Sequence, residues 1–192
     1  MSLRFDILAT PIAGLHVLQR KPTGDERGYL ERLFCAEELQ ALVTGKRIAQ
    51  VNHTLTVRRG TVRGLHFQHP PHAETKFVHC LRGEVFDVAV DLRRGSPTFL
   101  RWHAEVLSAA NHRTFVIPEG FAHGFQTLSD DSEMLYFHTA AYRQEAEGGL
   151  HVEDPRLAIR WPLPVAGLSP RDAAHAPLGD AFCGVVKPSC GD

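Results

Sequence analysis

The stretch FDVAVDL, residues 86–92, decides the fold because its side chains alternate with a period of two. The apolar residues at 86, 88, 90 and 92 face one way, and the residues at 87, 89 and 91 face the other, as in a β-strand. Just before this stretch, Leu81–Glu84 contains a glycine and indicates a turn to a second strand over Thr75–Cys80. The centre of the chain therefore predicts an antiparallel strand pair.

Further strands follow toward the C-terminus. Thr114–Ile117 predicts a short strand that is stopped by Pro118. Glu133–Tyr142 alternates again, so that Met134, Tyr136 and His138 are expected on one face of a strand.

One helix is predicted over Ala36–Val43, with Gly45 as its C-terminal stop. Many short strands separated by turn signals, with little helix, favour an all-β antiparallel sandwich or barrel. Among these architectures we expect a jelly roll with a few short helices.

The composition is that of an ordinary globular protein, with 43% hydrophobic and 22% charged residues in 192. The 16 glycines and 12 prolines are spread between short apolar runs, so residues 1–192 are expected to form a single domain. With 21 Lys and Arg against 22 Asp and Glu, no basic excess favours nucleic acid. No apolar run is long enough for a membrane span.

The first residues lack the apolar core of a secretion signal, and the four cysteines form no CxxC pair. We therefore expect a reduced, cytoplasmic protein.

Twelve histidines raise the question of a metal site. His123 ends the motif P-x-G-x-x-H at residues 118–123, and a metal would need two more ligands from His66, His69 and His72. Those three are spaced by three residues, so they alternate faces on a strand, and two prolines interrupt the run. The spacing disfavours a metal site, but a metal-dependent oxygenase or isomerase remains the alternative hypothesis.

Other polar residues have ordinary structural explanations when each is taken alone. His66 lies in RGLHFQ (63–68), Lys76 begins a predicted strand, and Tyr136 fits a strand core. The segment LSPRD (168–172) has the pattern of a helix start, with Ser at the N-cap, Pro at N1 and Asp172 at N3.

Together, and in this order, the motifs closely resemble the dTDP-4-dehydrorhamnose 3,5-epimerases. The resemblance rests on RGLHFQ, Lys76, GEVFDVAVDLRRGSPTF, IPEGFAHGF, the strand with Tyr136, and LSPRD, and it runs from about Gly24 to Pro177. It implies a cupin-type jelly roll, an isomerase that uses no metal or other cofactor, and a homodimer. It also implies a nucleotide-linked 4-keto-6-deoxy sugar as substrate, most directly dTDP-4-dehydro-6-deoxy-D-glucose converted to dTDP-4-dehydro-L-rhamnose, with inversion at C3, C5 or both.

The resemblance assigns four catalytic roles. His66 matches the base that removes a proton next to the C4 ketone, and Asp172 matches the carboxylate that orients it. Lys76 matches the cation beside the C4 oxygen, and Tyr136 matches the acid that returns a proton to the opposite face. A non-catalytic sugar-nucleotide-binding cupin is a further alternative, which these four intact residues disfavour.

Substrate-contact positions of the family match Arg27, Glu31, Gln50, Asn52, Arg63, His123, Tyr142 and Glu147, with Tyr142 as the aromatic that stacks on the base. Two departures fall among them. Glu31 stands one place early, so Arg32 is the rival for its position on the site face, and Gln144 replaces the usual proline after Tyr142.

Overall fold

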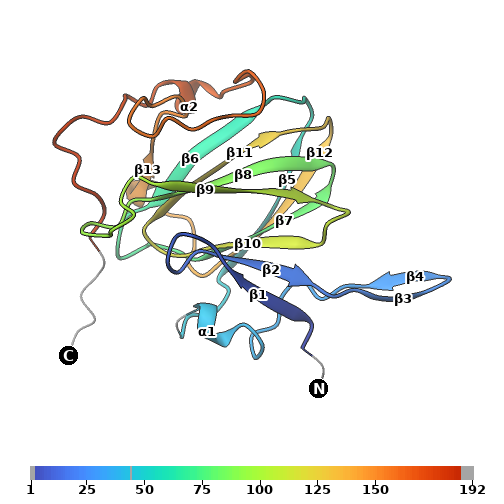
Figure 1. Cartoon of the computed structure of the whole chain (residues 1–192). Helices are drawn as coiled ribbons and strands as arrows, with labels where there is room; N and C mark the ends of the chain where they lie inside the picture. The colour runs from blue at the N-terminus through green and yellow to red at the C-terminus, as the bar shows by residue number, and fades with distance from the viewer. Residues whose placement is uncertain (1–2, 44, 187–192) are drawn as a thin grey trace.

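A computed structural model describes residues 3–43 and 45–186 (Figure 1). Its elements, in chain order, are β1 (Phe5–Ala9), β2 (His16–Arg20), β3 (Thr23–Asp25), β4 (Gly28–Leu30), α1 (Gln40–Val43), β5 (Gln50–Thr56), β6 (Val62–Gln68), β7 (Lys76–Arg82), β8 (Glu84–Asp91), β9 (Trp102–Ser108), β10 (Arg113–Ile117), β11 (Phe121–Thr127), β12 (Ser132–His138), the 3₁₀ turn η1 (Gln144–Ala146), β13 (Glu147–Gly149) and α2 (Pro170–Ala173).

Two antiparallel sheets form the body of the molecule. The six-stranded sheet has the order β1-β2-β10-β7-β12-β5, and the five-stranded sheet has the order β13-β6-β11-β8-β9. Buried residues of both sheets, among them Val78 and Phe115 of the first and Leu107 and Phe125 of the second, form one core cluster between them. The predicted antiparallel jelly roll of the cupin type is confirmed.

The alternation over residues 86–92 is confirmed, and the structure shows which face is which. Val88 and Leu92 point outward and pack against the C-terminal segment Leu150–Val185, which covers this face of the five-stranded sheet. Ala89 points inward to the core between the sheets, and Asp87 on the same face is fully buried. Both faces of β8 are therefore covered. The face with Val88 and Leu92 lies under the C-terminal segment, and the face with Asp87 and Ala89 lines the space between the sheets.

The outer face of the six-stranded sheet is partly covered by the segment that contains α1. Leu39 and Val43 bury their side chains against Phe77 of β7 in a separate cluster. The helix predicted over Ala36–Val43 is shorter than expected, because only Gln40–Val43 is helical and the residues before it form turns. Gly45 has φ +78°, which fits its predicted place just after the helix.

The strand predicted over Glu133–Tyr142 is also shorter, since β12 ends at His138. The chain then leaves the sheet, and the backbone N–H of Tyr142 donates to the side chain of Gln50 instead of to a neighbouring strand (2.9 Å). The expected shared face is correct, because Met134, Tyr136 and His138 are all buried.

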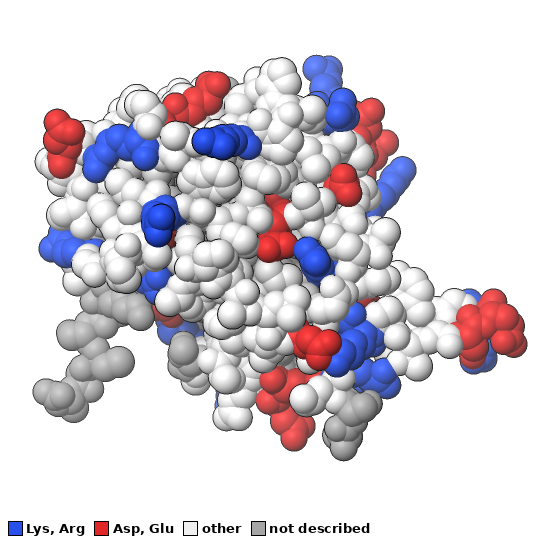
Figure 2. All heavy atoms as spheres, viewed as in Figure 1, with Lys and Arg blue, Asp and Glu red and all other residues white. Residues whose placement is uncertain are grey.

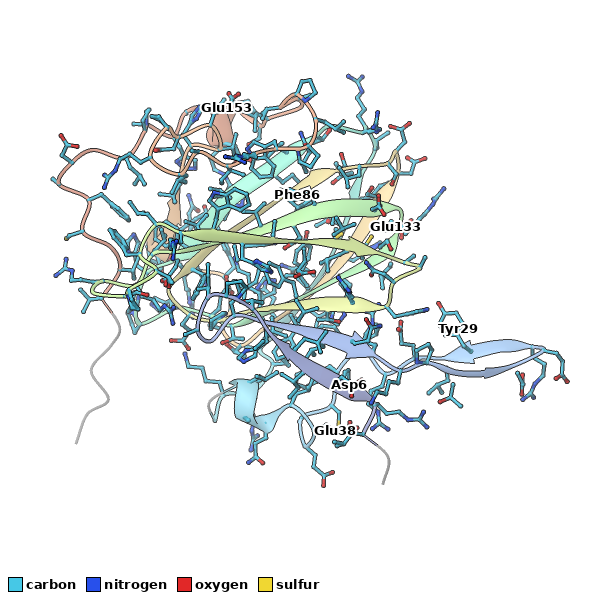
Figure 3. The ribbon with its side chains drawn as sticks, viewed as in Figure 1. Asp6, Tyr29, Glu38, Phe86, Glu133 and Glu153 are labelled. Carbon is cyan, nitrogen blue, oxygen red and sulfur yellow. The ribbon has the colours of Figure 1, made fainter. Side chains whose placement is uncertain are left out.

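The hairpin β3–β4 projects from the body of the molecule (Figure 1). Every residue of both strands is exposed, although the ring of Tyr29 on β4, labelled in Figure 3, packs edge to face against that of His112 just before β10 (5.5 Å between ring centroids). Figure 2 shows acidic and basic side chains together at the tip of this hairpin, and charges of both signs scattered over the rest of that face.

Among the residues that the structure describes, no helix has the length and apolar character needed to cross a membrane. Cys35, Cys80 and Cys183 are free thiols, and Cys190 lies outside the described residues.

Candidate active site

Two adjoining cavities open between the sheets. Cavity A, of about 310 Å³, is lined by Asn52, Thr54, Arg63, His66, Lys76, His123, Phe125, Tyr136, His138 and Arg171. Cavity B, of about 160 Å³, is lined by Gln50, Asn52, His66, Phe67, Gln68, Glu74, Lys76, His138, Tyr142 and Glu147. The two share the side chains of Asn52, His66, Lys76 and His138, so they form one continuous site.

His66 on β6 and Asp172 on α2 form a hydrogen-bonded pair. The Nε2 atom of His66 lies 2.8 Å from Oδ1 of Asp172. A carboxylate only accepts hydrogen bonds, so the ring hydrogen is on Nε2, and Nδ1 keeps a free lone pair. The imidazole is therefore held in the tautomer of a base.

Local structure fixes the carboxylate. Ser169 caps α2, and its Oγ accepts from the backbone N–H of Asp172 (3.1 Å), with Pro170 at the first helical position as the sequence predicts. The second carboxylate oxygen accepts from the backbone N–H of Gly64 (3.4 Å), two residues before His66. Asp172 is therefore held at both ends: its backbone N–H donates to the cap residue Ser169, and its carboxylate contacts His66.

The charges around this pair favour a neutral base. Burial lowers the pKa of the His66 imidazole, and the positive charges of Arg171 and Lys76 lower it further, against the opposing effect of Asp172. For Asp172, burial opposes ionisation, but the hydrogen bonds from His66 and Gly64 outweigh it and hold the pKa below its ordinary value. The pair is therefore a neutral imidazole beside a carboxylate at neutral pH.

Tyr136 on β12 lines cavity A on the other sheet. Its side chain is buried, with 8% of the residue exposed. Burial raises the pKa of the phenol well above its ordinary value, and the nearby Asp87 carboxylate adds to the effect. The phenol is therefore protonated, as a proton donor must be.

Lys76 begins β7, and 8% of it is exposed. Its Nζ atom lies 3.3 Å from Oε1 of Glu74 and donates to the backbone carbonyl of His66 (3.4 Å). The buried ammonium is thus compensated by a carboxylate, which avoids the large cost of an unpaired buried charge.

A second histidine–carboxylate pair lies deeper in the barrel. Nε2 of His123 on β11 is 2.9 Å from Oδ1 of Asp87 on β8, and both residues are buried. Burial raises the pKa of Asp87, although His123 opposes this shift. The His123 ring lies 6.1 Å from that of Tyr136, edge to face, so this pair supports the wall of cavity A behind the phenol.

The structure brings most of the predicted substrate contacts to these cavities. Gln50, Asn52, Tyr142 and Glu147 line cavity B or both, and Arg63 lines cavity A. The Tyr142 hydroxyl donates to Oε2 of Glu147 (3.0 Å), and the ring is about half exposed at the mouth of the site.

Two predicted contacts lie elsewhere. Arg27 sits on the exposed hairpin and pairs with Asp25. Glu31 forms an ion pair with the buried Arg20 (3.0 Å to Nε) and accepts a hydrogen bond from Nδ1 of His112 (2.7 Å). Arg32, the rival of Glu31 for the site, pairs with Glu38 instead. Strand β4 ends at Leu30, so strand alternation does not decide where these two side chains point.

Four ionisable residues in or beside the site were not identified from the sequence: Glu74, Asp87, His138 and Arg171. The lining residues Thr54, Phe67, Gln68 and Phe125 were not assigned either. The shared face of Tyr136 and His138 was a signal for the latter. Arg171 follows the helix-start proline, and its guanidinium lies 3.3 Å from Nε2 of His66 and 3.6 Å from Oδ1 of Asp172. Nothing in the local pattern at Arg171 indicated that contact.

The histidines proposed for a metal do not converge. Among the described residues, the group with metal-ligand spacing is His66, Asp172 and His175, whose ligand atoms lie within 4.8 Å of one another. It includes none of His69, His72 and His123. The Arg171 guanidinium beside His66 and Asp172 places a positive charge where a cation would bind, so the residues present fit a metal poorly.

Comparison with known proteins agrees with this geometry. The family model described as dTDP-4-dehydrorhamnose 3,5-epimerase matches residues 9–180. The dTDP-4-dehydrorhamnose 3,5-epimerase of Salmonella typhimurium is 43% identical over 177 residues, which cover 91% of this chain and 95% of that protein. A dTDP-4-dehydrorhamnose 3-epimerase of Streptomyces niveus is 39% identical, covering 88% of this chain and 82% of that protein.

Among solved structures, the dTDP-6-deoxy-D-glucose-3,5-epimerase of Legionella pneumophila, in complex with dTDP-4-keto-L-rhamnose, superposes with a TM-score of 0.89. It is 42% identical in sequence, and the match covers 96% of this chain and all of that one. The fold, the placement of His66, Lys76 and Tyr136 around one cavity, and the family match over residues 9–180 lead to one conclusion: the chain belongs to the dTDP-4-dehydrorhamnose 3,5-epimerase family.

Proposed function

We propose that this protein inverts one or both of the carbons that flank the C4 ketone of a dTDP-linked 4-keto-6-deoxy sugar. The most direct case is dTDP-4-dehydro-6-deoxy-D-glucose converted to dTDP-4-dehydro-L-rhamnose. The reaction proposed here uses only the side chains of the chain, without a metal or other cofactor.

One observation carries the proposal: His66 and Tyr136 line the same cavity from different sheets, and Lys76 lines it too. Strand β6 carries His66 in the five-stranded sheet, whereas β12 carries Tyr136 in the six-stranded sheet. A sugar between them meets a base on one side and an acid on the other. Inversion needs this arrangement, because a proton returned by the base would restore the original configuration.

The proposed steps balance protons as follows. Nδ1 of His66 takes the proton from the carbon next to the ketone, which leaves an imidazolium stabilised by Asp172 and an enolate on the sugar. The Lys76 ammonium stabilises the negative charge on O4. The Tyr136 hydroxyl then delivers its proton to the opposite face, and exchange with solvent restores His66 and Tyr136.

Binding of the nucleotide is proposed at the open end of the site. Tyr142 presents an exposed ring for stacking on the base, and Gln50 and Asn52 offer amides beside it. Arg63 and Arg171 line cavity A, and guanidinium groups pair well with the oxygens of a diphosphate.

We also propose that the protein works as a homodimer. Exposed apolar side chains lie on β5 and on the hairpin, including Val51, Leu55, Tyr29 and Leu30. A second copy packed on this surface would remove them from water. It would also give the projecting hairpin, with Arg27, a neighbouring site to approach. A cytoplasmic location stays a prediction.

The experiment is incubation of the protein with a dTDP-4-keto-6-deoxyhexose in D₂O, with deuterium followed by NMR. We expect exchange at C3, C5 or both, and the labelled positions identify which carbons are inverted. A Tyr136→Phe variant should still exchange protons through His66 but give much less inverted product. An unlabelled sugar after long incubation with the wild-type protein would refute the proposed activity on that substrate.

A further inference from the structure

Three neighbouring strands place polar side chains side by side next to the proposed site of chemistry. In the register of the six-stranded sheet, His138 of β12 lies opposite Lys76 of β7 on one side and opposite Gln50 of β5 on the other. Two residues back along β12, on the same face, Tyr136 lies opposite Asn52. His138 and Asn52 line both cavities.

Glu74 joins two of these side chains. One carboxylate oxygen, Oε1, lies 3.3 Å from the ammonium of Lys76, and the other, Oε2, lies 3.0 Å from Nδ1 of His138. The side chain of Glu74 is 9% exposed. Burial acts to raise the pKa of Glu74, but the hydrogen bond from His138 and the charge of Lys76 outweigh it and hold the pKa below its ordinary value.

The hydrogen bonds continue from His138 to the nucleotide end of the site. Nδ2 of Asn52 lies 3.4 Å from Nε2 of His138, and Nε2 of Gln50 lies 3.1 Å from Oδ1 of Asn52. Oε1 of Gln50 accepts from the backbone N–H of Tyr142 (2.9 Å). A single chain of contacts therefore connects Lys76 with the residue proposed to stack on the base.

The groups at the two ends of this series of hydrogen bonds determine which partner donates in each bond. The backbone N–H of Tyr142 can only donate, so Gln50 presents its oxygen there and its amide nitrogen to Asn52. Asn52 in turn presents its nitrogen to His138, whose Nε2 must accept. Nδ1 then carries the hydrogen and donates to Glu74, which as a carboxylate only accepts. Each orientation requires the next.

We propose that Glu74 and His138 are positioning residues of the epimerase site: Glu74 anchors the Lys76 ammonium beside the sugar ketone, and His138 ties that anchor to Asn52, Gln50 and the Tyr142 backbone. This inference rests on the proposed function and adds residues to it. Neither residue needs to touch the reacting carbons. Their role is to keep Lys76 in place when the nucleotide end of the site is occupied.

Glu74→Gln tests the anchor with little change in shape. Lys76 and His138 contact different oxygens of the carboxylate, and glutamine replaces one of these oxygens with an NH₂ group, so one of the two donors then faces another donor. We expect kcat to fall about tenfold or more because a small displacement of a charged group is costly in catalysis. The dissociation constant for dTDP should change less than kcat.

Glu133→Gln is the matched control. Glu133 also pairs with a histidine across β5 and β12, through Nε2 of His53 at 3.1 Å, but it lines neither cavity and lies at the rim of the sheet in Figure 3. We expect its kcat to be unchanged. Equal losses of kcat in both variants, or an unchanged kcat in Glu74→Gln, would overturn the proposal.

Two variants of His138 separate positioning from packing. Asparagine keeps an N–H donor near the place of Nδ1, whereas phenylalanine keeps the ring and loses every hydrogen bond. His138→Asn should therefore retain more kcat than His138→Phe at similar thermal stability. The reverse order would show that the ring is needed for packing alone and would refute the role given to His138.

A measurement without substrate tests the direction of the chain. In the ¹⁵N spectrum of histidine-labelled protein, the His138 signals are those missing from His138→Asn, and they should show a hydrogen on Nδ1. In Glu74→Gln, His138 should no longer be held in this single tautomer. A hydrogen on Nε2 of His138 in the wild type would refute the proposed series of hydrogen bonds. Absence of sugar exchange in the wild-type protein would instead refute the proposed function.

Discussion

Two cations and one anion surround the imidazole of His66, and burial acts on it as well. Asp172 alone would raise the pKa of the ring, as a partner carboxylate does for a paired histidine. Burial has the largest effect and lowers the pKa, and Arg171 and Lys76 act in the same direction. The balance keeps the base neutral at pH values where a free histidine is already partly protonated.

This balance predicts the acid limb of the pH–rate profile. Only neutral His66 can accept a proton, so kcat/KM should fall with an apparent pKa below about 6.5, the value of an unperturbed histidine. Arg171→Gln removes a positive charge 3.3 Å from Nε2 and should move the limb to higher pH, whatever it does to the affinity for substrate. A limb that stays in place or moves to lower pH in this variant would contradict the assigned base.

At the residue scale, the family resemblance of the ordered motifs predicted four site residues that no local pattern assigns singly, and it missed residues that come together across strands. His66, Lys76, Tyr136 and Asp172 were all predicted, and they line or flank one site. Glu74 was not among the predicted site residues. Its contacts with Lys76 and His138 depend on the register of β7 and β12, which no local pattern contains.

At the scale of elements, a close approach between β6 and β11 sets the position of the base. Gly64 has φ +133°, and a Cβ there would lie 2.6 Å from Cα of Gly124 and 2.9 Å from the carbonyl oxygen of His123. The register between the strands shifts at this point, between His123 and Phe125. Two glycines in contact therefore allow the two strands to meet where His66 and His123 lie opposite each other.

Gly64→Ala should destabilise the fold by about 3 kcal/mol, because backbone strain and overpacking each contribute about 1–3 kcal/mol. It should also lower kcat, since His66 is two residues away. Urea unfolding and the deuterium-exchange assay measure the two effects. Gly28→Ala is the control for strain alone: its φ is +128°, but nothing lies within 4 Å of the added Cβ. If both variants lose the same stability, the close approach to Gly124 has no energetic importance.

The elements themselves were predictable where strand periodicity is strong and less so where tertiary contacts end them. The alternation over residues 86–92 predicted β8, but it could not show that the side with Asp87 faces the barrel interior, because a C-terminal segment covers the apolar side. The helix predicted over Ala36–Val43 is one turn long in the structure, and Leu39, in the turn before it, still packs with Val43 and Phe77.

At the scale of the whole molecule, the sandwich supplies two walls for a reaction that needs two faces. The five-stranded sheet contributes His66 and His123, and the six-stranded sheet contributes Lys76 and Tyr136. The C-terminal segment adds Asp172 from outside. The proposed base and the proposed acid are thus separated by the layer structure of the fold rather than by a loop.

One predicted substrate contact, Arg27, is not explained by the two sheets of a single subunit. Arg27, expected to contact the substrate, lines neither cavity of its own chain and sits on a hairpin that projects from the body (Figure 1). In the proposed homodimer it would reach the site of the partner subunit. This prediction can be tested by mixing damaged subunits, without a structure of the dimer.

Arg27→Ala and Lys76→Ala, each expressed alone, should be impaired, the second by about 10²–10³ in rate because it removes the cation at the enolate oxygen. A heterodimer of the two variants, purified through a different tag on each chain, has one site with Lys76 from one subunit and Arg27 from the other. It should recover about half of the wild-type activity, since one of two symmetric sites is intact. A heterodimer of His66→Asn and Lys76→Ala is the control, because both lesions act within their own chains and neither site is restored. If the Arg27 heterodimer also stays inactive, Arg27 does not act across the interface.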